Sequence, residues 1–206
     1  MFARFVASQL SNPAGPIGRL LLGRLWNVRN RALNDATFEA LALQPDDHVL
    51  EVGFGGGYLL GRLATVLPAG ALAGVDRSPT MVRYAARRHR RLIGTGKLDL
   101  RCAPADALPY PAAAFTKACT VNSIFYWPDA AAAFLELRRV LQPAGLLVVC
   151  FTCRESLERK DFAAHGLRLY DVEDVESLLS AADFGAIGAT RAADAHRRFW
   201  CVRASA

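Results

Sequence analysis

The chain has 206 residues, of which 52% are hydrophobic and 21% charged, with a formal net charge of +6. A chain of this size and composition can bury one full hydrophobic core, which excludes disordered and fibrous proteins. The basic charge balance suggests an anionic partner such as nucleic acid, a hypothesis that needs a binding surface to support it.

The sequence predicts a cytoplasmic protein with no membrane insertion. No apolar run approaches the ~18 residues that a membrane-spanning helix needs. The first ten residues lack the charged start, long apolar segment and cleavage site of a signal peptide. Five cysteines scattered through apolar segments are typical of reduced thiols. The CxxC spacing of Cys150 and Cys153 has no second ligand pair, so we expect no metal site.

Apolar strand-like runs alternate with helical patterns from residue 46 onward. The expected strands are residues 48–52, 71–76, 98–102, 116–122, 146–152, 186–192 and 198–203. The expected helices are residues 57–67, 79–91, 130–141 and 171–182, the second and third of them capped by Ser78 and Asp129. This alternation predicts an α/β fold with a doubly wound, mostly parallel, Rossmann-like sheet of seven strands. The C-terminal hairpin is expected to add one antiparallel strand.

The first 45 residues lie outside this alternation and are expected to form a helical extension. Within it, residues 25–43 have the pattern of one helix. Asn27, Asn30 and Asn34 fall within ~60° of one another on that helix. Asparagines that face inward either tie the helix to the sheet or contact a ligand. We therefore divide the chain into a lid or extension, residues 1–45, and a main domain, residues 46–206.

A glycine-rich segment, GFGGG at residues 53–57, lies between the first strand and its helix. At such a position helix N-terminal amides face an anion, and missing side chains admit a ligand. The dinucleotide pattern G-x-G-x-x-G would need a glycine where Tyr58 stands, so the spacing excludes that class. Glu51 and Asp76 place acids at the ends of the first two strands, and a carboxylate at Asp76 can accept both hydrogens of a ribose diol.

On these residues the sequence resembles the class I S-adenosylmethionine-dependent methyltransferases, of the small-molecule type similar to the ubiquinone/menaquinone-biosynthesis methyltransferases. The resemblance covers residues 46–150 well and makes residues 46–206 a methyltransferase domain. It implies S-adenosyl-L-methionine as the cofactor, with Asp76 on the ribose, Met81 and Asp106 at the adenine and Asn122 facing the reacting methyl group. The positions implied to bind the cofactor are Glu51, Gly53, Phe54, Gly55, Gly57, Asp76, Arg77, Met81, Asp106, Ala107 and Asn122.

The resemblance implies methyl transfer to a small-molecule acceptor by in-line displacement, catalysed mainly by proximity and orientation. A general base is needed only if the acceptor must lose a proton, and no catalytic side chain is assigned. Candidate substrate or lid residues are Asn27, Asn30, Tyr126, Trp127 and His165. Phe54 and Tyr58 belong either to the core or near the sulfonium, and for Tyr58 we favour the core.

Two other functions stay open: methylation of RNA or protein, and cofactor binding without turnover. Basic charge alone supports a macromolecular substrate. The densest basic run, residues 87–91, falls at the C-terminal end of a predicted helix, where cations interact favourably with the helix dipole. The run lacks the interleaved aromatic side chains of a single-strand binding platform, so a nucleic-acid partner is disfavoured. The sequence makes no prediction about oligomeric state.

Overall fold

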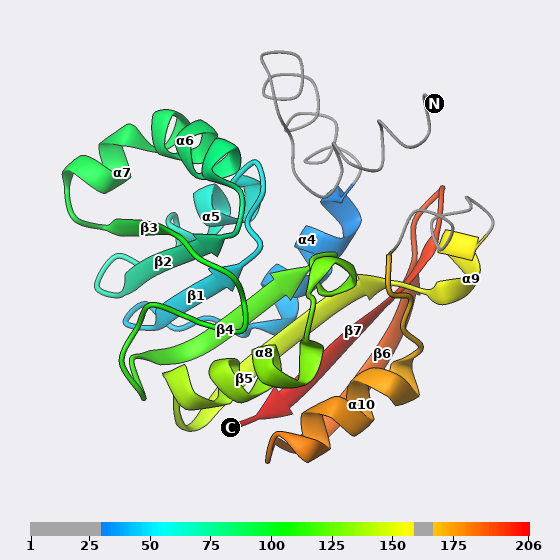
Figure 1. Ribbon diagram of the computed structural model, residues 1–206. Coiled ribbons are helices and arrows are strands. Elements are labelled where there is room, and N and C mark those ends of the chain that lie inside the picture. Colours follow the sequence, from blue (N-terminus) through cyan, green and yellow to red (C-terminus); the bar gives the residue numbers. More distant parts are fainter. Residues whose placement is uncertain (1–29, 159–166) are drawn as a thin grey trace.

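The computed structural model describes residues 30–158 and 167–206 (Figure 1). Its strands are β1 (His48–Val52), β2 (Ala71–Asp76), β3 (Leu98–Cys102), β4 (Phe115–Val121), β5 (Leu141–Thr152), β6 (Gly185–Ala193) and β7 (Arg198–Ser205). Its helices are α4 (Arg31–Ala40), α5 (Tyr58–Leu63), α6 (Pro79–Arg88), α7 (Arg90–Gly94), α8 (Ala130–Val140), α9 (Arg154–Glu158) and α10 (Val172–Ala181). A 3-10 turn, η2 (Ile124–Tyr126), follows β4.

The seven strands form one sheet in the order β3-β2-β1-β4-β5-β7-β6. β1 pairs in parallel with both β2 and β4, and β7 pairs antiparallel with both β5 and β6. The predicted doubly wound sheet with one antiparallel strand is therefore confirmed. The strand order reverses between β1 and β4, and ligands of open α/β sheets bind at this reversal, beyond the carboxyl ends of the strands.

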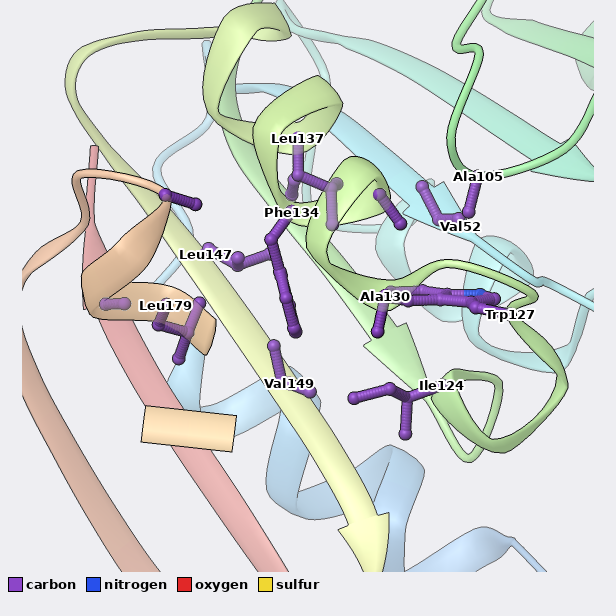
Figure 2. Close-up of a cluster of buried hydrophobic side chains, with 14 of the residues drawn as sticks. Val52, Ala105, Ile124, Trp127, Ala130, Phe134, Leu137, Leu147, Val149 and Leu179 are labelled. Atoms are coloured by element: carbon purple, nitrogen blue, oxygen red, sulfur yellow. The ribbon is translucent and has the colours of Figure 1, made fainter. Parts of the chain in front are cut away.

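Helices cover both faces of the sheet (Figure 1). Successive side chains of a strand point to opposite faces, so the sheet supplies two layers of core. On β5, Leu147 and Val149 belong to the cluster under α8 and α10, whereas Val148 and Cys150 belong to the cluster under α4, α5 and α6. Figure 2 shows the first cluster, to which α8 contributes Ala130, Phe134 and Leu137, β5 contributes Leu147 and Val149, and α10 contributes Leu179. Burial on both faces explains why β5 is apolar throughout its second half.

Three predicted helices differ from those observed. The helix predicted over residues 57–67 ends at Leu63, because Thr65 and Val66 donate backbone bonds to carbonyls only three residues back. The helix predicted over residues 79–91 is two helices, α6 and α7, separated at His89, whose backbone leaves the helical region at φ −107° and ψ 24°. The helix predicted over residues 25–43 ends at Ala40, and its first part lies outside the described residues.

All five cysteines lie in the described part of the chain and none forms a disulfide. No helix in the described ranges is long and apolar enough to cross a bilayer. Residues 30–158 and 167–206 also contain no cluster of three or more His, Cys, Asp or Glu side chains suited to a metal ion.

Truncation of Phe134 should strongly lower the free energy of unfolding. It is fully buried and meets Trp127 edge to face, with ring centroids 5.5 Å apart. Phe134→Ala should lower the free energy of unfolding by about 3–5 kcal/mol, because it removes apolar contacts and leaves a cavity. Chemical denaturation measures the change. The matched control is its neighbour Leu135, which is 55% exposed; Leu135→Ala should change stability by about 0.5 kcal/mol or less. Equal losses in the two variants would contradict this account of the core.

Candidate functional site

A cavity of about 210 Å³ lies at the carboxyl ends of β1, β2, β4 and β5. The predicted site residues that line it are Asn30, Glu51, Gly53, Phe54, Gly55, Asp76, Arg77, Met81, Asn122, Tyr126 and Trp127. The structure thus brings together eleven positions from the start of α4, from the ends of β1 and β2 and the segments that follow β1, β2 and β4, and from α6.

Three predicted cofactor positions do not line this cavity: Gly57, Asp106 and Ala107. Ala103 and Ala105 line the side of the cavity beyond β3 instead, and Asp106 is half-buried in the turn that follows. Two further candidates, Asn27 and His165, lie outside the described residues.

The glycine-rich loop has a backbone that side chains would disturb. Gly53, Gly55 and Gly57 all have positive φ, at 77°, 51° and 67°. A Cβ on Gly53 would lie 2.7 Å from Ser123 Oγ, so the loop packs directly against the end of β4. Gly57 anchors the loop to the α6–α7 junction, because its carbonyl accepts a hydrogen bond from His89 Nε2 at 2.7 Å. A carbonyl can only accept, so this bond fixes the imidazole proton on Nε2. Burial lowers the pKa of His89.

Asp76 joins the glycine loop to the start of α6. Its Oδ2 accepts a hydrogen bond from the Gly55 N–H at 2.9 Å, and its Oδ1 accepts one from the Ser78 N–H at 2.8 Å. Ser78 in turn caps α6 by accepting from the Met81 N–H, which places Met81 in the cavity wall with 2% of its surface exposed. Burial raises the pKa of Asp76, and the two backbone donors oppose that rise.

Glu51 is a buried acid in the cavity wall, with 3% of its surface exposed. Burial, together with the nearby charge of Asp76, raises the pKa of Glu51 to about 8, although the Leu60 N–H donates to the carboxyl group. Among the described residues, Glu51 Oε2 has no hydrogen-bond partner. A buried polar atom without a partner is costly, so this oxygen is suited to a donor that a ligand supplies.

Asn122 is the centre of a polar network at the end of β4. Its φ of 53° is left-handed, a conformation that asparagine tolerates better than most residues. Its Oδ1 accepts from the Thr152 N–H at 2.9 Å and from the Thr152 hydroxyl at 3.1 Å. Its Nδ2 donates to Asn30 Oδ1 at 3.0 Å, and Arg197 Nη2 donates to the same oxygen at 3.0 Å. The network ties the start of α4 to β4, β5 and the β6–β7 hairpin.

The aromatic side chains have different parts in the cavity. Trp127 is 7% exposed and packs on Phe134, so it belongs to both the wall and the core. Burial raises the pKa of Tyr126 to about 12, which keeps its phenol neutral at physiological pH. Tyr58, which we expected in the core, is half-buried and lines the cavity. Phe54 is 4% exposed and contributes to both the wall and the core.

The sequence analysis missed Thr152 and Arg197, both of which line the cavity. Thr152 ends a predicted strand, and that position could have suggested it. No local sequence signal could have suggested Arg197, because it reaches the cavity only through the antiparallel pairing of the final hairpin with β5.

Residues 50–149 match the family model described as "Methyltransferase domain". The chain carries a methyltransferase domain over these residues, which are just under half of its length, and its relatives and structural neighbours support an S-adenosylmethionine-dependent methyltransferase. This methyltransferase is 28% identical over 137 residues to the uncharacterized methyltransferase YdaC of Bacillus subtilis, an alignment that covers 66% of the chain and 74% of YdaC. It is 32% identical over 105 residues to an O-methyltransferase of Pyrenophora dematioidea, covering 51% of the chain but only 39% of that relative.

Solved structures show how widely this fold is used. An S-adenosylmethionine-dependent methyltransferase from Aquifex aeolicus superposes with a TM-score of 0.67 at 19% identity, covering 85% of this methyltransferase and 92% of that chain. The [4+2]-cyclase SpnF superposes with a TM-score of 0.73 at 23% identity, covering 84% and 80% of the two chains. These likenesses confirm the fold, and because the fold also serves a cyclase, the reaction must be argued from the site.

Glu51 makes the stability of the ligand-free protein depend on pH. Its carboxyl keeps its proton in the folded state up to a pH of about 8 but loses it near 4.5 in the unfolded chain. The folded state therefore binds the extra proton between these values, and its free energy of unfolding should fall as pH rises through that window.

Glu51→Gln should remove this decline, so the stability of the variant relative to wild type should grow from pH 5 to pH 8 and then level off. Urea denaturation at several pH values measures the difference. Glu136→Gln is the control, because hydrogen bonds from Arg139 lower the pKa of Glu136 and leave its charge constant over that window. A difference between Glu51→Gln and wild type that does not change with pH would show that Glu51 is ionised in the folded state.

Proposed function

We propose that this enzyme transfers the methyl group of S-adenosylmethionine to a small-molecule acceptor by in-line displacement. One observation carries the proposal: among the described residues, the cavity combines a glycine loop that has no room for a side chain at Gly53 with a buried carboxyl oxygen, Glu51 Oε2, that has no hydrogen-bond partner. Within class I, the motif pattern supports an enzyme similar to the ubiquinone/menaquinone-biosynthesis methyltransferases.

The residues present fit the cofactor. Asp76, already fixed by two backbone donors, would accept from the ribose hydroxyls. Glu51 Oε2 would accept from the ammonium group of the methionine moiety, and the resulting ion pair would favour the ionised carboxylate. Met81 would contact the adenine from the start of α6. When bound, the cofactor supplies a methyl group activated by its sulfonium sulfur.

The contribution of the chain's own residues is to hold geometry and to exclude water. Asn122 is fixed by Thr152 on one side and Asn30 on the other, so the end of β4 is rigid. Phe54 and Trp127 supply buried apolar wall. Alignment of nucleophile, methyl group and sulfur can contribute effective molarities of about 10⁵–10⁸ M, which reduces the need for a dedicated catalytic base.

Three observations support a small acceptor over RNA. Arg87, Arg88, Arg90 and Arg91 are exposed on α6 and α7, and none of them lines the cavity. The break at His89 also divides them between two helices. Among the relatives, erythromycin 3''-O-methyltransferase of Saccharopolyspora erythraea is 31% identical over 121 residues, which cover 39% of that enzyme, and its name states a small-molecule substrate.

Most of the lid that we predict over residues 1–45 lies outside the described ranges. In its described part, Leu33 and Leu41 of the α4 region are fully buried in the core, while Asn30 and Asn34 line the cavity. We therefore propose that α4 is a fixed wall of the site. Removal of the whole segment would also remove core, so a point substitution is the cleaner test of any role in binding.

A side chain at Gly53 should weaken cofactor binding by more than the backbone strain of a positive φ alone would explain. Gly53→Ala should lower the affinity for S-adenosylhomocysteine at least tenfold in calorimetric titration, because the new methyl group meets Ser123 and distorts the loop. Gly96→Ala is the matched control: its φ of 72° imposes similar strain, but nothing lies within 4 Å of the added Cβ. Equal affinities in the two variants, or no binding by wild type, would contradict the proposed cofactor site.

Turnover should be detectable with small acceptors. Wild-type protein with S-adenosylmethionine is screened against phenols, quinols, amines and thiols, and S-adenosylhomocysteine formation is measured. We expect turnover with at least one class and none with Gly53→Ala. Tight cofactor binding with no turnover on any class would favour a binding module, and salt-sensitive RNA binding with methylation would favour a macromolecular substrate.

A further inference from the structure

His89 is a buried residue to which the proposed function assigns no role. It lies at the junction of α6 and α7, is 9% exposed, and does not line the cavity. Burial lowers the pKa of its imidazole, so the ring is neutral at physiological pH. A neutral buried ring is held by its packing and its hydrogen bonds, and both of these lead to the glycine loop.

The packing of the ring depends on two glycines. A Cβ added to Gly57 would lie 3.0 Å from His89 Nε2, and one added to Gly61 would lie 3.1 Å from His89 Cε1. Heavy atoms in van der Waals contact normally lie about 3.5–4.0 Å apart, so a side chain at either position would crowd the imidazole. The ring therefore lies against the end of the loop and the first turn of α5 at once.

The backbone also departs from a regular helix at this residue. His89 has φ −107° and ψ 24°, so α6 ends at Arg88 and α7 begins at Arg90, where the sequence pattern favours one continuous helix. The helix break and the two missing side chains are separate local features. All three favour the same placement of the imidazole.

The hydrogen bond of the ring fixes one peptide unit. His89 Nε2 donates to the Gly57 carbonyl at 2.7 Å, whereas the first bond of α5, from the Gly61 N–H to the same oxygen, is 3.4 Å long. The shorter bond therefore sets the direction of this carbonyl. The Gly57–Tyr58 peptide is trans, so its C=O and N–H point in opposite directions. Because Tyr58 lines the cavity, one planar unit connects His89 to the cavity wall.

Gly57 needs such a restraint because its own backbone imposes little. Its φ of 67° is left-handed, a conformation that glycine adopts as readily as others because no side chain limits it. On the loop side, its N–H donates to the Phe54 carbonyl at 2.8 Å and closes a tight turn. On the helix side, the His89 bond selects one of the conformations that remain open to the glycine.

We infer that His89 is a positioning residue for the cofactor: by holding the Gly57 carbonyl, it keeps the glycine loop in the conformation that binds S-adenosylmethionine. This inference rests on the proposed function. A loop that is released from the bond spends part of its time in other conformations. Its apparent affinity then falls in proportion to the fraction that is still competent to bind.

Calorimetric titration of the full chain with S-adenosylhomocysteine tests the inference on two side chains of similar length. His89→Gln places an amide nitrogen as many bonds from the backbone as the imidazole Nε2, so it can still donate to the Gly57 carbonyl. His89→Met has no donor. The Met variant should lose affinity about three- to tenfold, the effect of one hydrogen bond, and the Gln variant should recover most of that loss.

Two further variants separate positioning from stability. His89→Asn carries the same amide one bond closer to the backbone, so it should lose affinity as His89→Met does. Val140→Ala is the control, because Val140 is fully buried in the cluster under α8 and α10 and does not line the cavity. Urea denaturation should show a lower free energy of unfolding for Val140→Ala, while its affinity for S-adenosylhomocysteine stays that of wild type.

Three results would overturn the inference. The first is wild-type affinity in both donor-deficient variants, His89→Met and His89→Asn. The second is an equal loss of affinity in all three His89 variants, which would assign the effect to the shape of the ring. The third is a loss of affinity in Val140→Ala as large as that in His89→Met, which would show that affinity follows stability. Failure of the proposed function is distinct, because wild type would then not bind S-adenosylhomocysteine at all.

Discussion

The site depends on the pair of hydrogen bonds that Asp76 accepts from the Gly55 and Ser78 amides. One carboxylate at the end of β2 thereby fixes the loop after β1 and the first turn of α6. Its burial is tolerated because backbone donors replace water, and a charged acceptor makes such bonds roughly twice as strong as neutral ones. This link joins the loop directly to the first turn of α6.

A second set of bonds supports the same loop from the opposite direction. His89 leaves the helical path and donates to the Gly57 carbonyl, while Ser123 fills the space that a side chain at Gly53 would need. The loop is thus held by β2, by the α6–α7 junction and by the end of β4. Rigid support from three elements suits the proposed catalysis by alignment.

Local signals in the sequence were enough to predict the sheet and the place of the glycine loop. Alternation of apolar runs predicted all seven strands, and the G-x-G-x-G spacing followed by Asp76 predicted the end of the sheet at which the cavity lies. Contacts between distant residues could not be predicted in this way. Asn30 and Arg197 share one hydrogen bond although they stand near opposite ends of the chain. The inward turn of His89 breaks a helix whose residue pattern alone favours continuity, because a tertiary bond outweighs local propensity. Tyr58 follows the pattern of a buried helix position, yet the neighbouring cavity leaves it half-exposed.

The reversed direction of β7 has an effect on how the site is assembled. In a parallel strand, the turn before its first residue would lie at the amino edge of the sheet, remote from the glycine loop. Because β7 runs antiparallel to β5, Phe199 is paired with Thr152 at the carboxyl edge, and the preceding turn closes over the same cavity. The last hairpin and the first loop of the domain therefore meet at one opening. Sequence changes confined to that hairpin can reshape one end of the cavity while leaving the loop after β1 untouched.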